Sequence, residues 1–230
     1  MRRLINAPNL VRRDDWSHRG HVTAPHAAIV PCYVARMCRL SLFALLIVTV
    51  MFTTGCGPTT RADATDITGV MPSLSFAMVR AGDSAHVTAA DYRGKTVLLY
   101  FGYTHCPDVC PTTLSNLADV LKDLGAKAND VRVLFVSVDP ARDALPQLKS
   151  YVTAFAPQID GLRGTPNQIA MLAQRYRVLY SVTQTPHGVE VMHSGSVFFF
   201  DRDGKAREVM TTTSDERGIA RDIASLLAHP

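Results

Sequence analysis

Two cysteines separated by three residues stand out in the segment CPDVCP, which spans residues 106–111. Each is followed by proline, and the residue before a proline is driven out of the helical region of backbone space. We therefore expect Cys106 in a loop and Cys110 at the N-cap of a helix that begins at Pro111. A thiolate near a helix N-terminus is stabilised by its free N–H groups, so thiol pKa values here should be lowered.

Such a pair can do two kinds of chemistry. The loop can close a reversible disulfide, although thioredoxin-type redox motifs have two intervening residues and this one has three. Alternatively, two thiolates can hold one soft metal ion, which favours Cu(I) or zinc over magnesium or calcium. A structural zinc site would need four ligands. The remaining cysteines, Cys32, Cys38 and Cys56, lie in or at the edge of an N-terminal leader and cannot supply them.

The elements that must position this pair follow from hydrophobic patterning. We expect strands at 74–80, 96–102, 131–138, 178–183, 197–200 and 206–210, and helices at 111–124, 144–155, 166–176 and from about 216 to the C-terminus. Thr165 and Pro166 should cap one helix, and Thr213 with Glu216 a second. Alternating strands and helices that end in a hairpin and a helix predict an α/β fold. Its thioredoxin-like mixed sheet would be flanked by helices, with an N-terminal β-hairpin addition.

Three residues outside the cysteine pair are candidates for the same site. His193 precedes the strand at 197–200, on a link that approaches the cysteine loop in a thioredoxin-like fold, and neutral imidazole is a good copper ligand. The alternative is a surface histidine. Asp139 ends the strand VLFVSV and is either an outer-shell acid near the thiols or a turn residue before Pro140. Met192 is either a soft contact to copper or a core residue.

The N-terminal residues read as an export signal. Residues 40–55 are uncharged and apolar apart from small residues, they follow Arg36 and Arg39, and they end at Cys56. This run is shorter than the roughly 20 residues of a membrane-spanning helix and fits a secretory signal. The ending TTGC resembles a bacterial lipoprotein signal, which predicts lipidation of Cys56. The alternative is an uncleaved signal anchor. Either places the body outside the cytoplasm.

The domain organisation follows from the same reading. Residues 1–56 form the leader, and Met37 would be a more normal start, so residues 1–36 are expected not to be translated. Residues 57–70 are small and polar and predict a flexible tether, and residues 71–230 form the folded domain. Of the 24 Lys and Arg, seven lie in the leader, so the remaining residues are close to neutral. The sequence therefore predicts no nucleic-acid partner.

The segment YFGYTHCPDVCPTTL closely resembles the Sco/SenC family of copper chaperones for cytochrome c oxidase. Segments at 133–143, 164–178 and 192–205 resemble the family in the same order. The resemblance implies a thioredoxin-like fold that holds copper with Cys106, Cys110 and His193. It also implies delivery of copper to the binuclear copper centre of the oxidase, through the oxidase's copper-accepting subunit.

This sequence departs from the family pattern at two points. Many relatives carry Asp before the ligand histidine, where this chain has Met192, and the family usually has a transmembrane helix rather than a lipid anchor. An extracytoplasmic thiol–disulfide oxidoreductase remains the alternative function. It would need both cysteines, but it would not need His193. A thiol peroxidase on the same fold is a third reading, weakened by the position of Thr104 only two residues before Cys106.

Overall fold

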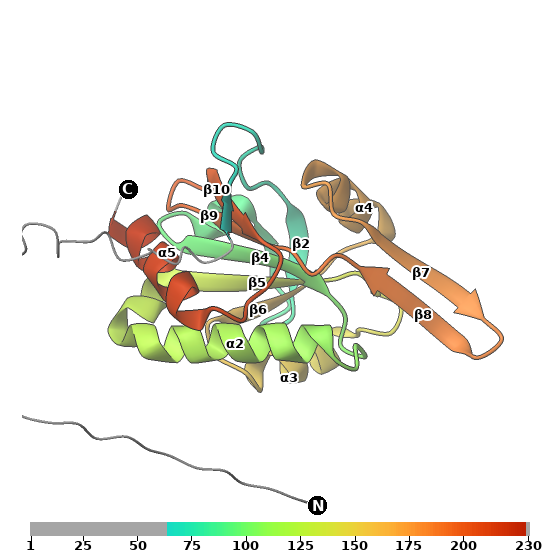
Figure 1. Ribbon diagram of the computed structural model, residues 1–230. Helices are drawn as coiled ribbons and strands as arrows, with labels where there is room; N and C mark the ends of the chain where they lie inside the picture. The colour runs from blue at the N-terminus through green and yellow to red at the C-terminus, as the bar shows by residue number, and fades with distance from the viewer. Residues whose placement is uncertain (1–63, 229–230) are drawn as a thin grey trace, which may run out of the picture. The chain divides into compact units, whose positions relative to one another are not determined.

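An eight-stranded mixed sheet forms the centre of the structure, a computed structural model that describes residues 64–228 (Figure 1). The strand order is β1-β10-β9-β4-β5-β6-β2-β3, and only the pairs β4–β5 and β5–β6 are parallel. The strands are β1 (Ala64–Asp66), β2 (Ala77–Arg80), β3 (His86–Thr88), β4 (Thr96–Gly102), β5 (Val131–Ser137), β6 (Ile159–Arg163), β9 (Val197–Phe200) and β10 (Ala206–Met210).

The two central strands, β4 and β5, are almost entirely buried. Every residue of β4, which reads TVLLYFG, is buried, and so is all of β5 except Arg132. A parallel strand covered on both faces needs such a continuous apolar run rather than an alternating one. The register aligns Gly102 with Ser137, so both strands end at the same edge of the sheet.

Helices cover both faces of the sheet (Figure 1). One face carries α2 (Val109–Leu124), α3 (Leu145–Thr153) and α5 (Glu216–Ala228), and α4 (Pro166–Arg175) lies on the other. Two short 3-10 helices, η1 (Ala89–Tyr92) and η2 (Gly125–Asp130), connect strands and helices. Helix α4 begins as predicted, because the Thr165 hydroxyl accepts the Gln168 N–H while the Gln168 side chain accepts the Thr165 N–H.

The predicted α/β class, with a mixed sheet flanked by helices, is confirmed. The N-terminal hairpin is present as β2–β3, which pairs with β6 at one edge of the sheet. Its second strand is 86–88, however, and not the expected strand at 96–102. The sequence reading also missed β6, whose IDGLR pattern alternates too weakly to predict a strand.

Two predicted local boundaries are wrong. Residues 64–70 were expected in the tether, but β1 pairs with β10 and Ile67 is buried, so the sheet holds this segment. The expected capping box of Thr213 and Glu216 is absent from the described start of α5. There the Asp215 carboxylate accepts a hydrogen bond from the Gly218 N–H. The Thr213 hydroxyl instead accepts a hydrogen bond from the Asn116 side-chain amide.

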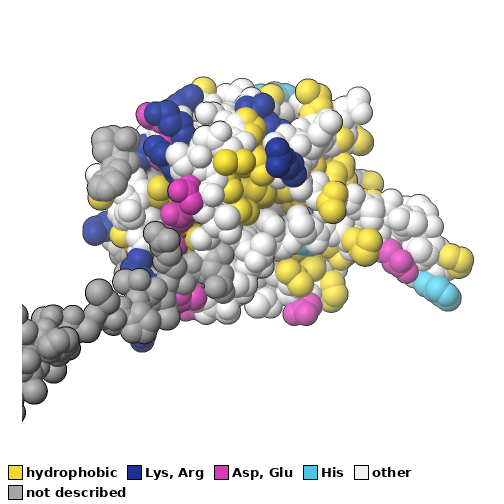
Figure 2. All heavy atoms as spheres, turned by 45° about the horizontal axis from the view of Figure 1, so that its top comes forward, with side chains coloured by type: hydrophobic (Ala, Val, Ile, Leu, Met, Phe, Trp, Pro, Cys, Tyr) yellow, Lys and Arg dark blue, Asp and Glu magenta, His cyan; other side chains and the backbone are white. Residues whose placement is uncertain are grey.

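A separate two-stranded sheet projects from the body between α4 and β9 (Figure 1). It consists of β7 (Tyr180–Thr185) and β8 (Gly188–His193), joined by the turn predicted at residues 186–188. Figure 2 shows hydrophobic side chains along this projection, and Leu179, Val182 and Met192 are among the exposed ones. Met192 is 72% exposed, so it is not the predicted core residue. Consecutive side chains of a strand point to opposite faces, so Met192 points away from the face that carries His193 and the predicted copper contact is not supported either.

The leader and Cys56 lie outside the described residues. No helix within residues 64–228 is both long and apolar enough to cross a membrane.

Candidate metal centre

Helix α2 begins two residues earlier than the sequence predicts. Val109 is its first residue and Asp108 its N-cap, so Cys110 lies inside the first turn and not at the cap. Proline disfavours a helical conformation in the residue before it but does not forbid one. The consequence is a buried Cys110, whose sulfur packs beneath the end of β4.

The sulfur of Cys106 caps the N-terminus of this helix by accepting a hydrogen bond from one of its free N–H groups. The Asp108 side chain makes no capping hydrogen bond, whereas the Cys110 N–H donates to Cys106 Sγ at 3.4 Å. Burial alone would raise the pKa of the Cys106 thiol. Hydrogen bonds from the N–H groups of Asp108 and Cys110 outweigh it and hold that pKa below its usual value.

Cys110 behaves in the opposite way. Its side chain is 0% exposed, and burial raises the pKa of its thiol to about 12. The expected lowering of thiol pKa values is therefore found for Cys106 and is wrong for Cys110. Space at this point is set by Gly102, since an added Cβ there would lie 2.8 Å from Cys110 Sγ.

His193 reaches the cysteines from the base of the projecting hairpin. It is the last residue of β8 rather than part of a link, and its Nε2 lies 3.2 Å from Cys110 Sγ. Its Nδ1 lies 3.1 Å from the Ser194 carbonyl oxygen, which can only accept, so Nδ1 carries the proton. Burial lowers the pKa of His193, which keeps the ring neutral and leaves the Nε2 lone pair facing the thiol.

Two tyrosines fix the plane of this imidazole. The rings of Tyr100 and Tyr103 lie edge-on to His193, with centroids 6.1 and 5.8 Å away. Tyr100 is fully buried in β4, and burial together with the nearby Cys110 raises the pKa of its phenol. Sequence reasoning missed both tyrosines, although their place at the end of the strand that leads into the cysteine loop was a usable signal.

The three predicted ligands thus meet in space. Cys106 Sγ, Cys110 Sγ and one ring nitrogen of His193 all lie within 4.8 Å of one another. Metal bonds of about 2.0–2.3 Å place the ligands of a three-coordinate ion roughly 3.5–4 Å apart, so this spacing needs only small adjustments. Two sulfurs and an imidazole suit copper or zinc, and no further Cys, His, Asp or Glu within residues 64–228 joins the group.

Asp139 does not join this group. Its carboxylate accepts a hydrogen bond from Arg142 Nε, and its carbonyl accepts the N–H groups of Arg142 and Asp143. The Arg142 guanidinium lies over the Tyr103 ring, 5.9 Å from the centroid. The Asp139 carboxylate is therefore separated from the site by Arg142 and Tyr103, and the contacts of Asp139 are those of a turn residue. The acid that touches the cysteine loop is Asp143, which sequence reasoning missed.

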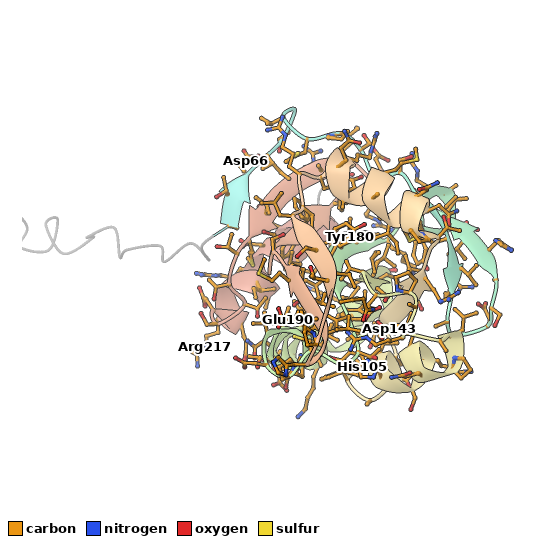
Figure 3. All side chains as sticks on the ribbon, turned by 90° about the vertical axis from the view of Figure 1, so that its right-hand side faces the viewer. Asp66, His105, Asp143, Tyr180, Glu190 and Arg217 are labelled. Carbon is orange, nitrogen blue, oxygen red and sulfur yellow. The ribbon has the colours of Figure 1, made fainter. Side chains whose placement is uncertain are left out.

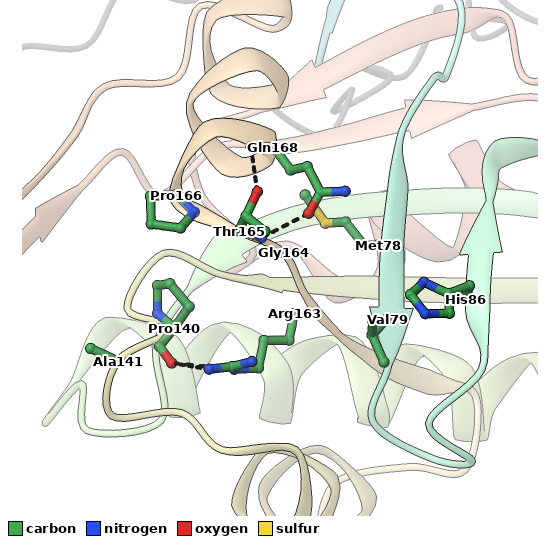
Figure 4. Close-up of a pocket in the computed structure, with 10 residues that line it drawn as sticks. All are labelled: Met78, Val79, His86, Pro140, Ala141, Arg163, Gly164, Thr165, Pro166 and Gln168. Atoms are coloured by element: carbon green, nitrogen blue, oxygen red, sulfur yellow. Dashed lines mark hydrogen bonds between the residues drawn. The ribbon is translucent and has the colours of Figure 1, made fainter.

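One pocket on the described surface lies away from the metal centre. Figure 4 shows a pocket lined by Met78, His86, Arg163 and Thr165, among others, on the β2 and α4 side of the molecule. Arg163 is engaged there, since its guanidinium donates to the Pro140 carbonyl. The metal centre is instead a shallow site, in which Cys106 and His193 are part-exposed above the buried Cys110.

Comparison with known proteins identifies the family. A sequence model described as SCO1/SenC matches residues 73–228, more than half of the chain. The chain belongs to the SCO1/SenC family. Among curated relatives, the mitochondrial protein SCO2 homolog of Bos taurus is 42% identical over 119 residues, which cover 50% of this chain and 45% of that protein. The chain spans about half the length of the curated relatives it matches.

Two solved Sco structures that resemble this chain in fold contain copper. A copper-bound ScoI from Bradyrhizobium japonicum is 34% identical, with a TM-score of 0.62 over 67% of this chain and 99% of that one. A copper-bound ScoI from Arabidopsis thaliana is 31% identical, with a TM-score of 0.63 over 69% and 99%. The Cys-Cys-His group of this chain and these copper-bound family members together support copper binding.

Proposed function

We propose that this chain is a copper metallochaperone that holds copper with Cys106, Cys110 and His193 and delivers it to the binuclear copper centre of cytochrome c oxidase. The observation that carries the proposal is the convergence of two sulfurs and a neutral imidazole nitrogen within 4.8 Å. The Nε2 lone pair already faces the Cys110 sulfur at 3.2 Å. Another Sco protein is a member of a family of cytochrome c oxidase assembly proteins, which supports the oxidase as the expected recipient.

The metal-free contacts suggest how copper enters and leaves. Cys106, part-exposed and with a lowered thiol pKa, is the group best able to meet an incoming ion as a thiolate. Copper would then replace the proton that the Cys110 thiol shares with His193 Nε2. Release would reverse these steps, with ligands of a recipient protein approaching from the side on which Cys106 and His193 are part-exposed. Metal transfer is therefore a ligand exchange coupled to return of the Cys110 proton.

A second function, thiol–disulfide exchange, is favoured by the asymmetry of the cysteines. An attacking thiolate should be accessible and a resolving thiol can be buried, which describes Cys106 and Cys110. Only the chaperone function requires His193, whose imidazole would let one site accept both Cu(I) and Cu(II). His193 therefore separates the two functions.

The deciding experiment compares the unchanged protein with His193→Ala and, as a matched control, His187→Ala at the exposed hairpin turn. Competition titration should show Cu(I) binding weakened by at least about 10-fold in His193→Ala only. The nitrogen signal in the Cu(II) spectrum should vanish in that variant, while disulfide reductase activity survives in part. Equal copper binding and equal spectra in all three proteins would replace the chaperone proposal with the oxidoreductase.

We also propose that Cys56 is lipidated and holds the copper-binding domain at an extracytoplasmic membrane surface. The uncharged run that ends at this cysteine supports the proposal. A tethered domain samples recipients embedded in the same membrane at a raised effective concentration.

A further inference from the structure

Asp143 is a fully buried carboxylate that the copper chemistry does not use. Its side chain is 0% exposed, yet no Lys or Arg is among its hydrogen-bond donors. Oδ2 accepts the Ser137 hydroxyl at 2.6 Å and the Thr104 N–H at 3.1 Å. Oδ1 accepts the Thr104 hydroxyl at 2.7 Å and lies 3.6 Å from His105 Nδ1. Burying a charge is costly unless its hydrogen bonds are made, so these contacts must matter to the folded state.

These bonds hold the turn that carries Cys106. The Cys106 N–H donates to the Tyr103 carbonyl at 3.3 Å, which makes residues 103–106 a turn with Thr104 and His105 at its centre. Asp143 contacts both central residues, and Figure 3 shows its side chain beside that of His105. The position of Cys106 Sγ therefore depends on where Asp143 holds the turn.

Asp143 is itself held from the opposite side. Its N–H donates to the Asp139 carbonyl at 3.0 Å, and Ser137, the last residue of β5, bonds its carboxylate. Pro140 follows Asp139 directly, and its carbonyl accepts hydrogen bonds from the guanidinium of Arg163, the last residue of β6 (Figure 4). The ends of two parallel strands thus form a rigid frame for the carboxylate.

We propose that Asp143 is a positioning residue that fixes the 103–106 turn so that Cys106 faces Cys110 and His193 as a preformed copper ligand. This inference rests on the proposed function, because it concerns the same site. Without the carboxylate the turn loses the two hydrogen bonds that Thr104 donates to it and keeps the exposed one from the Gln147 amide to the Thr104 hydroxyl, so copper must order the loop as it binds. That ordering lowers affinity without removing any ligand.

The main test is Cu(I) competition titration of Asp143→Ala, with Asp201→Ala as the matched control. Asp201 is an equally buried carboxylate that accepts the N–H groups of Asp203 and Lys205. It follows β9, at the end of the sheet opposite Gly102, since Phe200 pairs with Val97. We expect about 10- to 100-fold weaker copper binding for Asp143→Ala. Asp201→Ala should lose stability but keep its copper affinity.

A second pair of variants, at Thr104, tests the same contact without creating a buried cavity at Asp143. Thr104→Val keeps the side-chain shape but loses the hydroxyl donor to Asp143, whereas Thr104→Ser keeps that donor. Copper affinity should fall at least about 3-fold in the valine variant and recover in the serine variant. In the metal-free proteins, exchange of the Cys106 and Cys110 amide hydrogens should be faster in Asp143→Ala and Thr104→Val only.

The outcomes separate this inference from the proposed function. If the unchanged protein takes up no copper, the chaperone proposal fails. If it binds copper and Asp143→Ala binds equally well, only the positioning role is overturned. Should Asp143→Ala not fold, the threonine pair decides. Weaker copper binding by Thr104→Val than by Thr104→Ser supports the positioning role of Asp143, and equal copper affinities of the two variants overturn it.

Discussion

Two identical side chains in one short motif acquire different chemistry from their surroundings. Cys106 lies where helix N–H groups are free to donate, and Cys110 lies beneath β4 with no solvent. The first environment favours a thiolate and the second a thiol, so the pKa values of the two move apart. A pair tuned in this way exposes one reactive sulfur and keeps the other protonated until a metal arrives.

Copper affinity should therefore depend on pH. Because the pKa of the Cys110 thiol is about 12, binding must release its proton at any lower pH, whereas Cys106 is already a thiolate above its lowered pKa. Between these two pKa values we expect affinity to rise about tenfold per pH unit. Below the Cys106 pKa a second proton is released and the dependence steepens. Competition titrations at several pH values, with Cys110→Ser as control, would measure this, and a flat profile would contradict it.

Gly102 should tolerate no side chain. A Cβ there would lie 2.5 Å from Phe135 Cε2 and 2.8 Å from Cys110 Sγ, whereas one at Gly82 would meet nothing within 4 Å. Gly102→Ala should cost about 1–3 kcal/mol of unfolding free energy through overpacking and also weaken copper binding. Gly82→Ala serves as the control. Urea unfolding that shows equal stability for the two variants would refute this account of Gly102.

At the scale of elements, the hairpin β7–β8 is the least supported part of the site. It forms its own two-stranded sheet, and such a hairpin has little stability by itself. The Ser194 N–H donates to the Leu179 carbonyl and so closes the base of the hairpin itself, whereas His193 packs against the body through Tyr100 and Tyr103. The third ligand, His193, thus comes from a marginally stable hairpin, whereas both cysteines come from the junction of a core strand with a helix.

Hydrogen exchange should reveal this difference. Amides of β8 should exchange faster than those of β5 in the metal-free protein, because the hairpin opens locally. Copper should slow exchange in β8, since His193 then ties the hairpin to the cysteines. Saturation at 100 times Kd would add at most about 2.7 kcal/mol to the opening free energy. The same protection appearing in His193→Ala would argue against His193 as the anchor.

At the scale of the molecule, the folded domain begins earlier than composition suggests. β1 is the edge strand of the sheet and pairs with β10, and Ile67 is buried against the core. A fragment of residues 64–230 should therefore fold cooperatively without the leader. A fragment of residues 71–230 should fold with about 1.5–3 kcal/mol less stability, the value of burying one large aliphatic side chain. Equal urea midpoints for the two fragments would show that β1 contributes nothing.

Attachment to the membrane should depend on Cys56. The unchanged protein should take up labelled fatty acid in a bacterial host, and Cys56→Ser should not. Cys38→Ser, inside the leader, provides the control and should still be labelled. If the unchanged protein is never labelled yet stays with the membrane fraction, an uncleaved signal anchor replaces the lipid anchor.

The sequence alone determined the fold class and the two cysteine candidates, because both depend on local signals, whereas the choice of His193 rested on the expected fold and on the family resemblance. Continuous apolar runs mark strands β4 and β5, and the Cys-x-x-x-Cys spacing marks a site at a strand–helix junction. Tertiary structure decided what depends on contacts distant in sequence. It placed His193 at the end of β8, separated the pKa values of the two thiols by burial, and moved the acid beside the cysteine loop from Asp139 to Asp143. Both acids lie in one short segment, and their hydrogen bonds distinguish them, because Thr104 and Ser137 donate to Asp143 whereas Arg142 donates to Asp139.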